Sequence, residues 1–184
     1  EERERLRNHL GFPGKWCFVY TGRLVKGKGL EYLLRVWNDL VKEFTDIHLI
    51  LIGAGQGYSL SCEEELQEYI LVNQLATSVS ITGSIYNVYD YLAMADFFVF
   101  PSETEGCPMS LLEALAFGLP SIATEIDGIP VAEQFNVGSY SNSGRNYVDP
   151  ELLKQVDDII IIDNLSNSNI KVLDKNNQFT GKTV

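Results

Sequence analysis

DFFVFPSETEGCPMSLLEALAFGLPSIAT, residues 96–124, contains the pattern from which the architecture of the chain can be predicted. Phe97–Phe100 is an apolar run of strand length, and a proline ends it. A short helix is expected from about Pro108, closed by a glycine, and a second strand over Leu119–Thr124. Two short strands joined by a helix form a βαβ unit, and such units build parallel sheets. The segment therefore predicts a parallel α/β domain.

The helix expected after Pro108 carries polar side chains within an otherwise apolar run. Ser110 and Glu113 are three residues apart and therefore share one face. A carboxylate in a buried helix is costly unless something binds it, and the preceding loop adds Glu105. The first backbone N–H groups of a helix are unpaired and suit an anion. Loop and helix together thus offer two carboxylates beside a site for phosphate.

This arrangement resembles the glycosyltransferases of the GT-B fold, in particular their family four of retaining enzymes (glycosyl transferases group 1). The mark of that family is a glutamate, seven residues and a second glutamate, seen here as Glu105 and Glu113. The run EGCPMSLLEALAFGLP is similar to the donor-site signature over its whole length, and the resemblance covers roughly 15–130. It implies the C-terminal, nucleotide-sugar-binding half of a two-domain enzyme, whose N-terminal acceptor domain is missing.

Strand-like and helix-like runs alternate from residue 16 to residue 124. Further strands are expected over Trp16–Thr21, Ile47–Ile52 and Val79–Thr82. Further helices are expected over 1–10, about 30–44, 61–73 and 86–95, the third opened by a capping box of Ser61 and Glu64. The order predicts a doubly wound, mainly parallel, Rossmann-like sheet, which binds ligands beyond the carboxyl ends of its strands.

Three parts of the chain are expected. Residues 1–14 are a helix and linker, 15–162 form the nucleotide-sugar-binding domain, and 163–184 are a polar, partly disordered tail. After Pro130 the pattern weakens, although Pro150–Asp158 is expected to be a helix and Ile159–Ile162 a strand.

Composition and charge narrow the class of protein. The 184 residues are 45% hydrophobic, which indicates one globular domain. The net charge of −11 argues against binding to nucleic acid or to anionic membranes. No apolar run approaches the roughly 20 residues of a membrane span, so no transmembrane segment is expected. Cys17, Cys62 and Cys107 are too scattered for a disulfide scaffold or a zinc site, which favours a reducing, cytoplasmic location.

The loop after the first strand, GRLVKGKG at 22–29, is rich in glycine and basic residues. Arg23 offers a planar fork and Lys28 a mobile point charge, and both suit phosphate oxygens. Taken from the residues alone, they could equally be two solvated cations. The resemblance implies that Gly22 lies at the nucleotide and that Arg23 and Lys28 stabilise the leaving diphosphate.

The resemblance also implies roles for the second half of the site. Glu105 contacts hydroxyls of the donor sugar, and Glu113 accepts the ribose hydroxyls. The backbone N–H groups of Met109 and Ser110 meet the distal phosphate, and main-chain atoms near Ile85 meet the nucleobase. Taken without the resemblance, Glu105 could be a surface charge and Glu113 the partner of a buried cation.

The GAGQG segment at 53–57 is similar to a dinucleotide fingerprint only in part. The next expected helix starts several residues later, and no acidic residue ends the following strand, which argues against an NAD-type site. A tight turn that lines the pocket is the other interpretation.

The resemblance thus implies the donor-binding domain of a retaining enzyme that transfers a hexose from a nucleotide diphosphate sugar to a hydroxyl acceptor. The isolated domain is expected to be inactive, and no cofactor or metal is expected. Two alternatives stay open. The chain could be a stand-alone nucleotide-sugar-binding module or partner subunit, or part of a sugar-nucleotide epimerase of the same fold.

Overall fold

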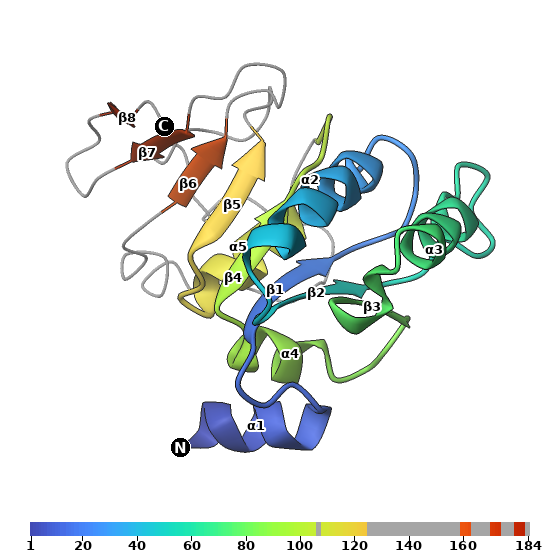
Figure 1. Cartoon of the computed structure of the whole chain (residues 1–184). Helices are drawn as coiled ribbons and strands as arrows, with labels where there is room; N and C mark the ends of the chain where they lie inside the picture. The colour runs from blue at the N-terminus through green and yellow to red at the C-terminus, as the bar shows by residue number, and fades with distance from the viewer. Residues whose placement is uncertain (106–107, 125–158, 163–169, 174–178, 183–184) are drawn as a thin grey trace, which may run out of the picture.

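A computed structural model of the chain describes residues 1–105 and 108–124, together with the backbone of three later strands at 159–162, 170–173 and 179–182 (Figure 1). The strands form one sheet in the order β3-β2-β1-β4-β5-β6-β7-β8. Their bounds are β1 Trp16–Thr21, β2 Ile47–Ile52, β3 Val79–Gly83, β4 Phe97–Phe100, β5 Ser121–Thr124, β6 Ile159–Ile162, β7 Ile170–Leu173 and β8 Phe179–Lys182.

The strand order reverses at β1. The chain runs outward from β1 to β2 and β3, then returns to place β4 on the other side of β1, followed by β5 and β6. All of these neighbours pair in parallel, whereas β7 pairs antiparallel with both β6 and β8. The predicted doubly wound, mainly parallel sheet is therefore confirmed. In such a sheet the gap between β1 and β4, where the order reverses, is the usual place for a ligand.

Helices cover both faces of this sheet, as Figure 1 shows. Their bounds are α1 Glu2–Leu10, α2 Leu30–Glu43, α3 Glu63–Val72, α4 Val88–Met94 and α5 Met109–Ala116, with a short 3-10 turn at Leu75–Thr77. Side chains of α1, α4 and α5 share one apolar core, and those of α2 and α3 share the other. None of the helices in the described part of the chain has the length and apolar character needed to cross a membrane.

The strand sequences explain the two cores. Successive side chains of a strand point to opposite faces, so Ile50 and Ile52 join the α1/α4/α5 core while Leu49 and Leu51 join the α2/α3 core. Both sets are buried, which is why β2 reads as a continuous apolar run. Trp37 of α2 is 1% exposed and packs its ring edge-on against the ring of Phe18, with the centroids 5.2 Å apart.

Ion pairs and hydrogen bonds attach the first helix, α1, to the rest of the domain. Arg7 is buried, and its guanidinium lies 2.6 Å from an Asp96 carboxylate oxygen and 2.9 Å from the Met94 carbonyl oxygen. Arg3 contacts the other Asp96 oxygen at 2.5 Å, and the backbone N–H of Cys17 donates to Asp96 at 2.7 Å. Asp96 therefore ties α1 and β1 to the start of β4.

The expected capping box at the start of α3 does not form. The residue before the helix is Cys62, which gives no side-chain cap, and Glu64 is exposed. The Glu63 carboxylate instead accepts hydrogen bonds from the backbone N–H groups of Gly55 (2.7 Å) and Gln56 (3.2 Å). The predicted capping box was therefore wrong. The glutamate that accepts backbone hydrogen bonds is Glu63 rather than Glu64, and its donors lie in a turn outside the helix.

Other differences concern element bounds. β5 begins at Ser121 rather than at 119, and α4 spans Val88–Met94 rather than 86–95. Near the ends of α5, Met109 and Phe117 are 44% and 42% exposed, so this helix is not buried all round. The strand expected at 159–162 is present, and β7 and β8 lie where a polar tail was expected. The helix expected at 150–158 lies outside the described residues.

Candidate functional site

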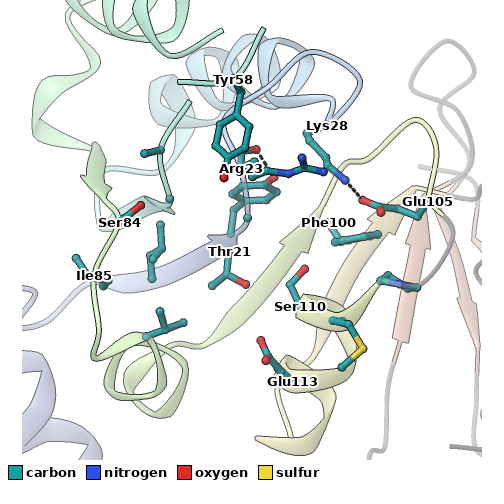
Figure 2. A pocket seen from close by; sticks show the side chains of 18 residues that line it. Thr21, Arg23, Lys28, Tyr58, Ser84, Ile85, Phe100, Glu105, Ser110 and Glu113 are labelled. Atoms are coloured by element: carbon teal, nitrogen blue, oxygen red, sulfur yellow. Dashed lines mark hydrogen bonds and ion pairs between the residues drawn. The ribbon is translucent and has the colours of Figure 1, made fainter. Parts of the chain in front are cut away.

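A cavity of about 690 Å³ opens at the carboxyl ends of β1 to β4 (Figure 2). This volume lies within the range of small-molecule sites, about 300–1,000 Å³. Every site residue predicted from the sequence lines it, namely Gly22, Arg23, Lys28, Ile85, Glu105, Met109, Ser110 and Glu113. These residues come from loops and from helix α5, which are far apart in the chain, and the parallel sheet brings them to one edge.

Backbone hydrogen bonds join the loops that form the floor of the cavity. The Gly22 N–H donates to the Ile52 carbonyl oxygen at 2.9 Å, and the Gly53 N–H donates to the Gly83 carbonyl oxygen at 3.0 Å. A Cβ on Gly53 would lie 1.8 Å from the Gly22 carbonyl oxygen, and Gly53 has a φ of +142°. Only glycine is compatible with both conditions. The loops after β1, β2 and β3 are therefore held as one unit.

The GAGQG segment acts as a packing turn. The Glu63 carboxylate already occupies the N–H groups of Gly55 and Gln56, as described above, and a Cβ on Gly55 would lie 2.4 Å from the Leu24 carbonyl oxygen. A phosphate could use those N–H groups only by displacing Glu63. This geometry favours the tight-turn interpretation over a dinucleotide fingerprint.

Arg23 is exposed at the rim of the cavity. Its guanidinium carbon lies 5.3 Å from the centroid of the Tyr58 ring, within cation–π distance. The buried Tyr20 hydroxyl donates to the Arg23 carbonyl oxygen at 3.1 Å, which fixes the backbone below the side chain. In the described ranges Arg23 forms no ion pair, so its charge remains available to an anion.

Lys28 and Glu105 form an ion pair across the cavity mouth. Their side chains are only 18% and 14% exposed. The loops that carry them meet closely, because the Glu103 N–H donates to the Gly27 carbonyl oxygen at 3.0 Å. The resemblance implies separate ligands for these two residues, whereas in the structure they form an ion pair with each other.

Glu113 presents the opposite situation. It is half-buried on α5, and burial raises the pKa of its carboxyl group. No described residue forms an ion pair or hydrogen bond with its carboxylate, so the alternative of a buried cation partner finds no support among the described residues. Ser110 lies one turn earlier, and the preceding Pro108 provides no side-chain cap for α5.

The labelled side chains in Figure 2 surround the space between these groups. Arg23 and Lys28 lie along one side, Ser110 and Glu113 lie on α5 along the other, and Ser84 and Ile85 close one end. The arrangement can therefore hold an elongated ligand with an anionic middle and hydroxyl groups near the carboxylates.

Sequence reasoning missed several residues of the site. Thr21 and Phe100 end strands β1 and β4, so the rule that ligands bind at strand ends would have found them. Tyr58 and Ser84 follow glycines but carry no motif of their own. Within the described residues, no three His, Cys, Asp or Glu side chains gather as metal ligands would.

Fold and cavity together define a Rossmann-like α/β domain with an anion-compatible cleft at its topological switch point. The chain belongs to the family Glycosyl transferases group 1, whose profile matches residues 16–145. An uncharacterized glycosyltransferase of Haemophilus influenzae is 35% identical over 117 residues, which cover 64% of this chain and 32% of that protein. The chain spans about a third of the length of the curated relatives it matches.

Two solved structures have a similar fold. The C-terminal domain of LpcC, a glycosyl transferase group 1 family protein from Francisella tularensis, has a TM-score of 0.64 and 24% identity, over 71% of this chain and 68% of that one. HepE from Anabaena, in complex with UDP and glucose, has a TM-score of 0.63 and 22% identity, over 69% of this chain and 34% of that one.

Proposed function

We propose that the chain is the donor-binding, C-terminal domain of a retaining glycosyltransferase. The complete enzyme would transfer a hexose from a nucleotide diphosphate sugar to a hydroxyl acceptor. The observation that carries this proposal is the meeting of Arg23, Lys28, Glu105 and Glu113 around one cavity at the switch point of the sheet. The retaining outcome and the hexose are part of the proposal and rest on the family resemblance. A cytoplasmic location is also proposed, and it rests on the scattered cysteines.

The charges of the cavity suit the parts of such a donor. Arg23 and Lys28 would bind the diphosphate and stabilise the charge that develops on it as the sugar leaves. The start of α5, at Met109 and Ser110, would direct its N-terminal dipole at the distal phosphate. HepE, whose fold is similar, was solved with UDP and glucose, a nucleoside diphosphate and a hexose.

The carboxylates would bind the hydroxyl groups of the donor. Glu113, which has no partner among the described residues, would accept the ribose hydroxyls, because charge-assisted hydrogen bonds are strong. Glu105 would accept a sugar hydroxyl beside Lys28, and the backbone at Ile85 would line the nucleobase. Nothing in this scheme needs a metal or a cofactor.

The isolated chain should bind a nucleoside diphosphate weakly and transfer no sugar. In the complete enzyme an acceptor domain would exclude water and position the acceptor. Calorimetric and thermal-shift titrations with UDP, GDP and ADP test the binding. An absence of binding to all three at millimolar concentration would contradict the proposed function.

A matched pair of lysine variants makes this test specific. Lys28→Gln should weaken binding by about 2 kcal/mol, the scale of a hydrogen bond to a charged group. Lys26→Gln removes the same charge from the same loop, but Lys26 is exposed and lies outside the cavity lining, and its ammonium group pairs with Glu65 at 3.7 Å. Equal effects of the two variants would mean that the chain attracts nucleotides only through its general charge.

A further inference from the structure

Ser102 lies just after β4, behind the wall of the cavity. It is fully buried and is not among the residues that line the cavity. Its hydroxyl donates a hydrogen bond of 2.8 Å to Glu105 Oε1. Its carbonyl oxygen accepts a hydrogen bond of 2.5 Å from the Thr124 hydroxyl at the end of β5. Ser102 therefore links the end of β5, through Thr124, to the cavity residue Glu105.

The two oxygens of Glu105 are unequally occupied. Oε1 accepts from both Ser102 Oγ and Lys28 Nζ, which is about as many strong hydrogen bonds as one carboxylate oxygen takes. No described residue donates to Oε2. Two donors on one oxygen restrict rotation of the carboxylate group, and the second oxygen remains for another donor.

A second buried serine shows that this partner is not dictated by burial alone. Ser121 is also fully buried, but its hydroxyl donates to the carbonyl oxygen of Leu119, two residues away, at 3.1 Å. A buried hydroxyl must find a partner, and a nearby backbone carbonyl is enough for Ser121. The hydroxyl of Ser102 instead supports the charged side chain that faces the cavity.

We infer that Ser102 is a positioning residue that fixes the Glu105–Lys28 pair, so that Glu105 Oε2 is presented to a hydroxyl group of the donor sugar. The sugar part of this inference rests on the proposed function. The competing interpretation is that Ser102 only stabilises the turn after β4.

The first experiment needs no ligand. Lysine acylation with a limiting amount of reagent, quantified by mass spectrometry, reports how accessible Lys28 is, with Lys26 of the same loop as internal reference. Ser102→Ala frees Glu105 to rotate and should raise the Lys28-to-Lys26 labelling ratio several-fold. Ser121→Ala, the matched control, should leave the ratio unchanged. Equal ratios in Ser102→Ala and wild type would overturn the inference.

The second experiment compares each nucleotide sugar with its own nucleoside diphosphate, using UDP-glucose, GDP-mannose and ADP-glucose. Ser102→Ala should weaken the binding affinity for the sugar nucleotide about tenfold more than the affinity for the nucleoside diphosphate. This is the change expected from losing one hydrogen bond to a charged group. In a Glu105→Ala background the same substitution should add nothing, because Ser102 acts through Glu105. Equal weakening of both ligands would overturn the inference and leave the proposed function intact.

The two proposals fail in different ways. If wild type binds none of the nucleotides, the proposed function fails, and with it the sugar contact. The labelling ratio then decides by itself whether Ser102 fixes the Glu105–Lys28 pair.

Discussion

The two ends of the sheet carry charge clusters of opposite character. At the amino ends of the strands, Asp96 receives Arg3, Arg7 and the Cys17 N–H, so both carboxylate oxygens are occupied. At the carboxyl ends, Glu113 has no partner among the described residues, and Glu105 is occupied through one oxygen. Fully satisfied charges are typical of structural links, whereas unsatisfied half-buried charges are typical of binding sites. The comparison separates an anchoring cluster from a ligand cluster in one domain.

Breaking the anchoring cluster should have the largest effect on stability. Asp96→Asn keeps the shape of the side chain but removes the buried carboxylate from Arg7, whose side chain is 10% exposed, and leaves it the exposed Glu4 at 3.7 Å. We expect the free energy of unfolding to fall by about 3 kcal/mol, since breaking a buried pair strands the other charge. Urea denaturation measures this change.

A surface pair supplies the control for that variant. Asp39 and Lys42 form an exposed pair at 2.6 Å, and Asp39→Asn should cost at most about 1 kcal/mol. Nucleotide affinity of folded Asp96→Asn should match wild type. A loss of affinity without loss of stability would mean that the two ends of the sheet are not separate in function.

Glu113→Gln tests the ligand cluster and should have a smaller, opposite effect on stability. Removing an unpaired half-buried charge should leave stability unchanged or raise it, while nucleotide binding weakens by about 1–2 kcal/mol. Melting temperature and calorimetric affinity, measured on the same sample, separate the two effects. A large loss of stability with unchanged affinity would mean that Glu113 has a structural role and does not bind the nucleotide.

The pH dependence of this variant follows from the raised pKa of Glu113. A carboxyl group whose pKa is raised by folding contributes stability below its ordinary pKa, and this contribution is lost as the pH rises through the folded value. Any stabilisation by Glu113→Gln should therefore be present at neutral pH and vanish near about pH 4. A stabilisation of the same size at both pH values would contradict the burial effect.

Thr21→Val should have the smallest effect. The Thr21 hydroxyl is buried and has no hydrogen-bond partner within the described ranges, so replacing it with a methyl group of similar shape should stabilise the domain by about 1 kcal/mol. Thr124→Val is the matched control, because the Thr124 hydroxyl bonds the Ser102 carbonyl oxygen and its loss should destabilise. Denaturant midpoints of the two variants that shift in the same direction would contradict this distinction.

The sequence predicts the parts of the fold that depend on local patterns. The buried strand at 47–52 and the α2 helix follow from apolar periodicity. Arg23 was predicted from the basic, glycine-rich loop after the first strand, and Glu113 from its place in an apolar helix and its spacing to Glu105. Their convergence on one cavity is a consequence of the strand order.

Contacts between distant segments could not be predicted in this way. The partner of Arg7 is Asp96, 89 residues away, so the docking of α1 has no local signature. The Lys28–Glu105 pair spans 77 residues, and the support from Ser102 depends on the conformation of the turn after β4. The capping box was mispredicted for a similar reason. The Glu63 carboxylate accepts a hydrogen bond from Gly55, in a turn outside its own helix, and no local pattern indicates this contact.

The glycine contacts beneath the cavity have a consequence for how a ligand is enclosed. Gly53 is bonded to Gly83 and packed against Gly22, so the segments after β1, β2 and β3 cannot move independently. A ligand that settles on them loses little affinity to the entropic cost of ordering the protein. Binding in this part of the cavity therefore requires no folding of these segments over the ligand.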